Sequence, residues 1–368
     1  MNEEVLPQRA GAVRASIVDC DIHPSPRSPD DIDAFLPARW REHRRLFGSH
    51  VRQAFTEIFP FPRMAPEVSR HDAWPPRGGP PGSDLGFMRE QHLDPMGVEV
   101  GMLIPLRTRA ADQRNLDFGA ALCTAVNEWQ KAAWLDPEPR LRGAVVVGQE
   151  WPEAAVAEIR RCAKDRRFAQ VLLPPRTAEP LGRRRYRPIL RAAAEAGLPV
   201  ALHVGGVANH PVTGGGTPSF YFEEHHSNVQ TMQAVVTSLV TEGVFEDIPE
   251  LRVVLIEGGF AWAAPLGWRL DSHWRSLKAE VPQLRRAPSE YIRRHFWFTT
   301  QPIDEPDAPE DLLTAMDWVG WERLMFSSDY PHWDQDDPRY AFRVRLPEER
   351  RAALFRGTAA AFYGLDAA

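Results

Sequence analysis

The sequence predicts an α/β fold, a (β/α)8 TIM barrel, from three observations. Apolar segments of strand length alternate with helical segments along most of the chain. About eight such apolar segments occur, and continuous apolar runs are expected of parallel strands covered on both faces. Metal-ligand residue types follow several different strands, and no Gly-x-Gly-x-x-Gly turn follows the first one. Together these favour a closed barrel over an open doubly wound sheet.

The first strand is expected within residues 16–23, and residues 24–93 follow as an insertion rich in Pro, Arg, Trp and Phe. Later strands are expected at 98–106, 141–147, 168–173, 200–204, 252–257, 295–300 and 323–328. Apolar residues at helical spacing predict helices over 111–135, 152–165 and 187–196. The chain, 1–368, is therefore predicted to be one barrel domain. Its insertion carries aromatic residues such as Trp74 and Phe87, and we expect it to cap the barrel mouth.

The bulk composition narrows the ligand class. The chain has 368 residues, a formal net charge of −6 and a pI of about 6.1, so no overall cationic field attracts nucleic acid or an anionic membrane surface. A small-molecule ligand fits better. Three dispersed cysteines indicate a reduced, cytoplasmic protein. Neither a signal peptide nor an apolar segment of about 20 residues is evident, so neither secretion nor membrane insertion is expected.

Five strand-end residues form the candidate metal site. Asp21 and His23 occupy alternate positions at the end of the first strand, so their side chains face the same way. His203, Glu257 and Asp329 end the fifth, sixth and eighth strands, and all strand ends of a barrel open onto one mouth. Each has an ordinary structural explanation when taken alone. Jointly they favour one or two divalent ions (zinc, iron or manganese), because buried carboxylates need a compensating charge.

Further residues are candidates for the substrate and for proton transfer. We expect Glu257, Asp329 and His225 to act in catalysis. Arg107 and Arg176 follow strands and suit planar oxyanions, although a solvated arginine is the simpler interpretation. His225 and His226 are adjacent on a helix, about 100° apart, so at most one should face the mouth. The remaining substrate-binding candidates are His226, Gln301 and His332, and a glycine-rich loop at 204–216 is a candidate lid.

Several motifs carry a family resemblance. Asp21-Ile-His23, Leu202-His203, Ser328-Asp329-Tyr-Pro and the terminal Gly357-Thr-Ala-Ala-Ala-Phe-Tyr-Gly364 resemble the amidohydrolase-related group of the amidohydrolase superfamily, which includes metal-dependent aromatic-acid decarboxylases. The resemblance implies that Asp21, His23, His203 and Asp329 are metal ligands. It also implies a homo-oligomer, because relatives are often dimers or larger. Where many relatives have a catalytic histidine after strand six, this chain has Glu257, which suits either a base or a ligand.

Three reactions are compatible with this ligand set. We rank first a hydrolase that uses metal-activated water on an ester, lactone, amide or thioester. The alternative is a decarboxylase of a hydroxylated aromatic or unsaturated acid. A third hypothesis is a non-haem iron or di-iron oxygenase, because histidines and carboxylates also ligate iron. A binding module without activity is the least favoured class.

Overall fold

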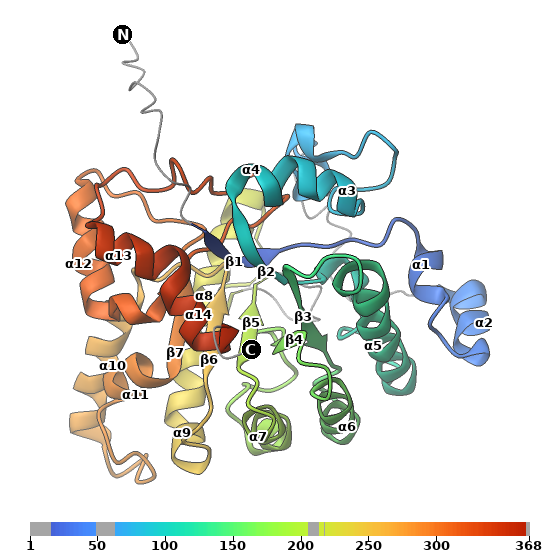
Figure 1. Cartoon of the computed structure of the whole chain (residues 1–368). Coiled ribbons are helices and arrows are strands. Elements are labelled where there is room, and N and C mark those ends of the chain that lie inside the picture. Colours follow the sequence, from blue (N-terminus) through green and yellow to red (C-terminus); the bar gives the residue numbers. More distant parts are fainter. Residues whose placement is uncertain (1–15, 49–62, 205–212, 217, 366–368) are drawn as a thin grey trace.

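The fold is a parallel eight-stranded barrel surrounded by helices (Figure 1), as the sequence predicts. A computed structural model describes residues 16–48, 63–204, 213–216 and 218–365. The strands pair in chain order and in parallel. They are β1 (Ile17–Ile22), β2 (Val98–Leu103), β3 (Leu141–Val146), β4 (Phe168–Leu173), β5 (Val200–His203), β6 (Val253–Ile256), β7 (Phe296–Thr299) and β8 (Leu324–Met325).

Every predicted strand is present, but most are shorter at their carboxyl ends. The largest error is β8, predicted over 323–328 and observed over Leu324–Met325. The backbone amides of Ser327 and Ser328, which follow β8, donate to side chains and not to the backbone of a neighbouring strand. Ser327 N–H donates to the Thr300 hydroxyl, and Ser328 N–H donates to the Asp19 carboxylate. Polar side chains thus replace strand pairing at the barrel mouth.

The outer helices alternate with the strands. The predicted helix 111–135 begins later, as α5 (Leu116–Gln130), because the Asn115 side chain caps the amide of Phe118. A π-helical turn continues it over Lys131–Leu135. The other outer helices are α6 (Pro152–Cys162), α7 (Arg187–Glu195), α8 (Tyr221–Thr241), α9 (Val244–Asp247), α10 (Ala263–Leu277), α11 (Pro288–His295), α12 (Pro309–Val319), α13 (Glu348–Ala352) and α14 (Thr358–Tyr363).

The segment after β1 contains short helices: α1 (Pro29–Asp33), α2 (Ala38–Phe47), α3 (Leu85–Met88) and α4 (Asp94–Met96). Its residues 49–62 lie outside the described part of the chain. Figure 1 shows α1 and α2 projecting beside α5, away from the barrel. Farther along, Trp333 N–H donates to Val68 O at 2.8 Å and Arg70 N–H donates to Pro331 O at 3.1 Å. The described insertion therefore contacts the loops around the mouth; its role as a cap stays a prediction.

The barrel closes where β8 meets β1. Cys20 N–H donates to Phe326 O at 3.1 Å, Asp329 N–H donates to Asp21 O at 3.1 Å, and Ile22 bridges Tyr330 in parallel. Apolar strand residues such as Leu202 and Phe298 are buried in one continuous core. Cys20, Cys123 and Cys162 are buried free thiols. Among the described helices, none is both long and apolar enough to cross a membrane.

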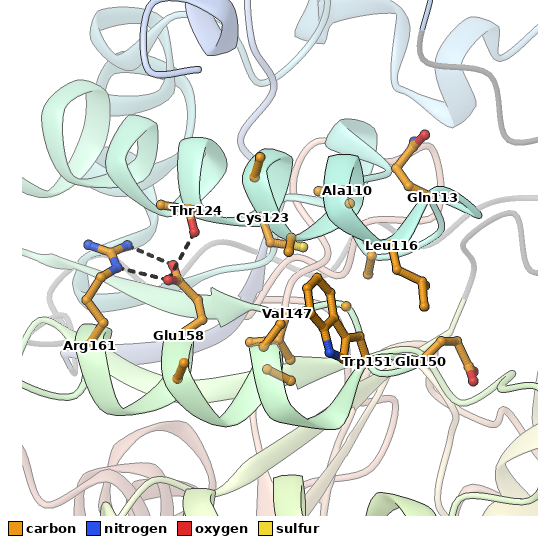
Figure 2. Close-up of a pocket in the computed structure, with 18 of the residues that line it drawn as sticks. Ala110, Gln113, Leu116, Cys123, Thr124, Val147, Glu150, Trp151, Glu158 and Arg161 are labelled. Carbon is orange, nitrogen blue, oxygen red and sulfur yellow. Dashed lines mark hydrogen bonds and ion pairs between the residues drawn. The ribbon is translucent and has the colours of Figure 1, made fainter. Parts of the chain in front are cut away.

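A cavity of about 460 Å³ lies outside the barrel, between α5 and α6 (Figure 2). Its walls are mainly apolar and include Val147 and Trp151. At one end the buried Glu158 accepts hydrogen bonds from Thr124 at 3.1 Å and from Arg161 at 2.7 Å. No predicted site residue lines this cavity, so it is separate from the barrel mouth.

Candidate active site

The five residues predicted as metal ligands converge at the mouth. His23 Nε2 lies 3.1 Å from Asp21 Oδ1 and 2.7 Å from Asp329 Oδ1. His203 Nε2 lies 3.3 Å from Asp21 Oδ2 and 3.2 Å from Glu257 Oε2. Residues more than 300 positions apart in the chain thus meet at one point, as the barrel topology requires.

Backbone geometry turns two of these carboxylates toward the centre. Glu257 has φ 56° and Asp329 has φ 65°, left-handed values that non-glycine residues rarely adopt. Glu257 directly follows β6, and Asp329 lies in the loop after β8, where its backbone N–H donates a hydrogen bond to Asp21 O. Such strain persists where the surroundings enforce it, often at functional sites.

Backbone carbonyls fix which imidazole nitrogen faces the centre. His23 Nδ1 lies 2.9 Å from Ile104 O, and His203 Nδ1 lies 2.5 Å from Val204 O. A nitrogen that donates to a carbonyl leaves the other as the acceptor or ligand atom. His23 and His203 therefore each offer Nε2, and only Nε2, to the site.

The donor set fits a divalent cation. Ligand atoms of Asp21, His23, His203 and Glu257 all lie within 4.8 Å of one another, and a second overlapping group consists of His23, Glu257, Asp329 and His332. Asp21 Oδ1 is buried without a hydrogen-bond partner in the structure. Within the described residues, the ion pairs of these three acids are all to histidines, with no arginine or lysine. A cation at this point would neutralise the carboxylates and complete the coordination of Asp21.

Burial and crowded charge shift the pKa values of the metal-free cluster. Burial raises the pKa of Glu257 to about 8, with nearby Asp334 and Asp21 adding to the shift and His203 opposing it. Burial lowers the pKa of His203, but Asp21 and Glu257 outweigh it, and the result is about 9. Burial, reinforced by Glu257, raises the pKa of Asp329 well above its usual range. The cluster therefore holds protons at neutral pH that a metal ion must displace.

A cavity of about 430 Å³ opens in front of this cluster, a size suited to a small organic molecule. Both predicted arginines line it, and Arg107 is ion-paired with Glu67 of the insertion at 2.6 Å. The other site residues in its lining are His23, Glu257, His225 and His332, with Tyr221, Trp333 and Asp334 beside them.

The two adjacent histidines of α8 separate as expected. His225 faces the cavity, where its Nε2 lies 3.3 Å from Asp334 Oδ2 and 3.9 Å from Glu257 Oε1. His226 is exposed and does not line the cavity, so the structure does not bring this predicted substrate residue to the mouth. Residues 205–212, most of the predicted lid at 204–216, lie outside the described residues.

The loop after β8 contributes more than the sequence indicated. His332 Nδ1 contacts Asp329 Oδ1 at 2.6 Å, and its ring stacks on His23 at 4.3 Å. Gln301 is fully buried and donates from Nε2 to Asp329 Oδ2 and Asp334 Oδ2, so it lies behind the acids rather than in the cavity lining. Asp334 was not predicted as a site residue, because it does not end a strand. Its only sequence signal is its place five residues after Asp329.

Comparison with known proteins gives one family. A family model described as amidohydrolase matches residues 18–365. The gamma-resorcylate decarboxylase of Rhodococcus jostii (strain RHA1) is 28% identical over 309 residues, which are 77% of this chain and 87% of that protein.

Solved structures share the fold. The dihydroxybenzoic acid decarboxylase of Polaromonas sp. JS666, solved with bound manganese and the inhibitor 2-nitroresorcinol, has a TM-score of 0.70 at 19% identity, covering 96% of this chain and 98% of that one. The 5-carboxyvanillate decarboxylase of Sphingomonas paucimobilis has a TM-score of 0.68 at 20% identity, covering 95% and 99%.

Proposed function

Because the chain belongs to the amidohydrolase family, we propose that it is a metal-dependent decarboxylase of a hydroxylated aromatic acid. From the sequence alone, hydrolysis ranks first. The relatives favour its alternative, because the similar curated proteins are gamma-resorcylate decarboxylases. The structural observation that supports the proposal is an imidazole, His225, that lines the cavity 3.9 Å from Glu257 and belongs to neither group of candidate ligands. Decarboxylation needs such a separate proton donor.

We assign the ion to Asp21, His23, His203 and Asp329, with Glu257 beside it as a further ligand or a base. When bound, a divalent ion would supply positive charge for the substrate carboxylate and an adjacent hydroxyl oxygen. One ion fits better than two, because His23 and His203 each have a single nitrogen left for coordination. Glu257→Gln separates its two roles: loss of bound metal identifies a ligand, and loss of activity with full metal content identifies a base.

Metal affinity is expected to rise with pH between 6 and 8. Glu257 and His203, with pKa values of about 8 and 9, must both lose protons to bind an ion, so lower pH favours the protonated, metal-free form. We expect the logarithm of the Mn²⁺ dissociation constant to fall by about one to two per pH unit. Calorimetric titration in buffers of different ionisation enthalpy gives both the affinity and the protons released. A pH-independent affinity would contradict this.

His225 would deliver the proton. Asp334 raises the pKa of His225 by a hydrogen bond, which favours the charged imidazole despite its partial burial. In the proposed step the ring carbon bearing the carboxylate takes the proton of His225. The bond to the carboxylate carbon then breaks, its electron pair returns to the ring, and carbon dioxide leaves. Solvent at the cavity opening reprotonates His225.

His225→Gln is expected to lower kcat by about 10²- to 10⁴-fold, the usual contribution of a general acid. Asp334→Asn should cost less and move the alkaline limb of the kcat profile to lower pH, because His225 loses the carboxylate that favours its charged form. His226→Gln is the matched control on the adjacent, exposed position and should leave kcat unchanged. Steady-state rates of carbon dioxide release measure all three. Equal losses in His225→Gln and His226→Gln would exclude the donor role.

The reaction itself is tested by products. The purified protein loaded with Mn²⁺ is incubated with 2,6-dihydroxybenzoate, 5-carboxyvanillate and a panel of aryl esters and lactones. We expect release of carbon dioxide with one equivalent of the decarboxylated phenol. Hydrolysis without carbon dioxide would reinstate the hydrolase hypothesis, and oxygen consumption would reinstate the oxygenase.

Arg107 and Arg176 would hold oxyanion groups of the substrate, since guanidinium matches planar carboxylates. The ion pair with Glu67 fixes Arg107 at the cavity wall. His332 and Gln301 would act by holding Asp329, which both contact.

We also propose a homodimer. Exposed apolar side chains lie just after α1 (Phe35), on α2 (Leu46 and Phe47) and at the start of α5 (Leu116). The projecting α1–α2 segment (Figure 1) would otherwise expose them to water. Sedimentation analysis of the wild type and of Leu46→Glu with Phe47→Glu tests this contact; an unchanged mass would move the interface elsewhere.

A further inference from the structure

Asp19 is a buried carboxylate that takes no part in the proposed reaction. It is hydrogen-bonded to Asp21, a candidate ligand, and to Ser328, which precedes the candidate ligand Asp329. It is fully buried on β1, two positions before Asp21. One oxygen, Oδ1, accepts from Ser328 N–H at 2.9 Å and from Asp21 N–H at 3.2 Å. The other, Oδ2, accepts from the Ser328 hydroxyl at 2.6 Å and lies 2.8 Å from His92 Nε2.

These contacts supplement the backbone pairing. Beyond Met325, where β8 ends, Cys20 N–H still donates to Phe326 O, and Asp329 N–H donates to Asp21 O. Between these two bonds, the Asp19 side chain binds Ser328. Ser328 immediately precedes Asp329. The Asp19 carboxylate therefore connects the loop that carries Asp329 to β1, the strand that carries Asp21. The Ser328 hydroxyl also accepts the amide of Tyr330, which fixes the backbone on both sides of Asp329.

His92 connects this pair to the end of the insertion. It lies in the π-helical turn Arg89–Leu93, is 1% exposed, and stacks on Tyr330 at 4.5 Å. Its Nδ1 lies 3.4 Å from Gln335 Nε2, which suits a neutral imidazole that accepts there and donates from Nε2 to Asp19. Within the described residues, His92 is the only basic group paired with Asp19.

We propose that Asp19, Ser328 and His92 form a positioning triad that sets the spacing of Asp21 and Asp329 for the divalent ion. This inference rests on the ion site proposed above. It assigns no chemistry to the triad: its members act through the residues they hold. Residues that orient metal ligands in this way typically change metal affinity by about 10- to 100-fold when replaced.

The test is Mn²⁺ titration of metal-free protein by calorimetry, with a thermal melt of each variant. For Asp19→Asn we expect the dissociation constant for Mn²⁺ to rise about 10- to 100-fold. The carboxylate accepts hydrogen bonds through both oxygens, whereas the asparagine amide has only one oxygen that can accept. His92→Leu should weaken Mn²⁺ binding, whereas His92→Gln, which retains an N–H donor near the Nε2 position, should restore it in part. At saturating Mn²⁺ the variants should recover most of kcat.

Glu158→Gln is the control: it alters a buried, multiply hydrogen-bonded carboxylate that lines the α5–α6 cavity. It should lower thermal stability and leave Mn²⁺ affinity unchanged. Asp19→Asn with lost stability but unchanged affinity would overturn the proposal and make the triad merely structural. If Asp19→Asn fails to fold, equal affinities of His92→Leu and wild type would overturn it instead. Wild-type protein that binds no Mn²⁺ would defeat the ion site as well, whereas normal binding without decarboxylation defeats only the reaction.

Discussion

Asp329→Asn is expected to lower decarboxylation by at least about 10³-fold while the barrel stays folded, because loss of a catalytic charge at such a centre costs several kcal/mol in transition-state stabilisation. Asp329 contacts His23 at 2.7 Å and His332 at 2.6 Å, and its carboxylate is fully buried. Asparagine keeps the shape and removes the charge, so bound Mn²⁺ should fall far below one equivalent.

Although Asp329→Asn should lose activity and bound metal, the metal-free variant should be at least as stable as the metal-free wild type. Burial and the neighbouring Glu257 raise the pKa of Asp329, which means that its charged form is disfavoured in the folded state. For such a group the folded state binds more protons than the unfolded state, so its contribution to stability is lost as pH rises from the unfolded pKa through the raised folded pKa. Asp329→Asn removes this loss. The melting temperature of the metal-free protein at pH 8 should therefore be equal to or above that of wild type.

Asp336→Asn is the matched control for this substitution. Burial and nearby Asp334 raise the pKa of Asp336 to about 7, and it lies in the same loop without joining either group of candidate ligands. It should retain Mn²⁺ and most activity. An Asp329→Asn protein with one equivalent of Mn²⁺ and wild-type turnover would refute the role given to Asp329.

Gly82→Ala is expected to cost about 2–5 kcal/mol of unfolding free energy, combining backbone strain with steric overlap. Gly82 has φ 76°, and a Cβ there would overlap the carbonyl oxygen of His23. The hydrogen bond from Ser25 N–H to Gly82 O prevents the two segments from separating freely. Displacement of His23 should also lower activity by about 10- to 100-fold, since small misplacements of catalytic groups are costly.

Gly78→Ala separates the two causes. Gly78 belongs to the same segment and has φ 80°, but a Cβ there meets nothing within 4 Å. Gly78→Ala should lower the free energy of unfolding by about 1–2 kcal/mol, through backbone strain alone, and should bind Mn²⁺ normally. Urea unfolding and Mn²⁺ titration of both variants make the comparison. Equal effects would mean that the contact between the insertion and His23 does not matter to the site.

The strands and their terminal ligand types were predictable because both depend on local pattern. Apolar runs located all eight strands, and barrel topology then required that Asp21, His203 and Asp329 meet. Strand ends were less predictable. The backbone amides of Ser327 and Ser328, after Met325, donate to the side chains of Thr300 and Asp19. Partners this far away in the chain produce no periodic pattern in the sequence.

Loop residues were the least predictable part of the site. Asp334 lies in the loop after β8 and contacts His225, whereas Asp19 lies on β1 and contacts Ser328 of that loop. Both contacts depend on the conformation of the loop and not on spacing along a strand. The reaction was hard to rank for the same reason. A cluster of acids and imidazoles suits hydrolysis, decarboxylation and oxygen chemistry alike, and the groups that discriminate between them lie on loops.

The closure of the barrel between β1 and β8 has a consequence for biosynthesis. His23 is translated 306 residues before Asp329. The nascent chain therefore carries its acidic strand end without Asp329 and its loop until that loop has been synthesised. Metal loading is expected to follow translation, and chains arrested before Asp329 should be unable to retain Mn²⁺.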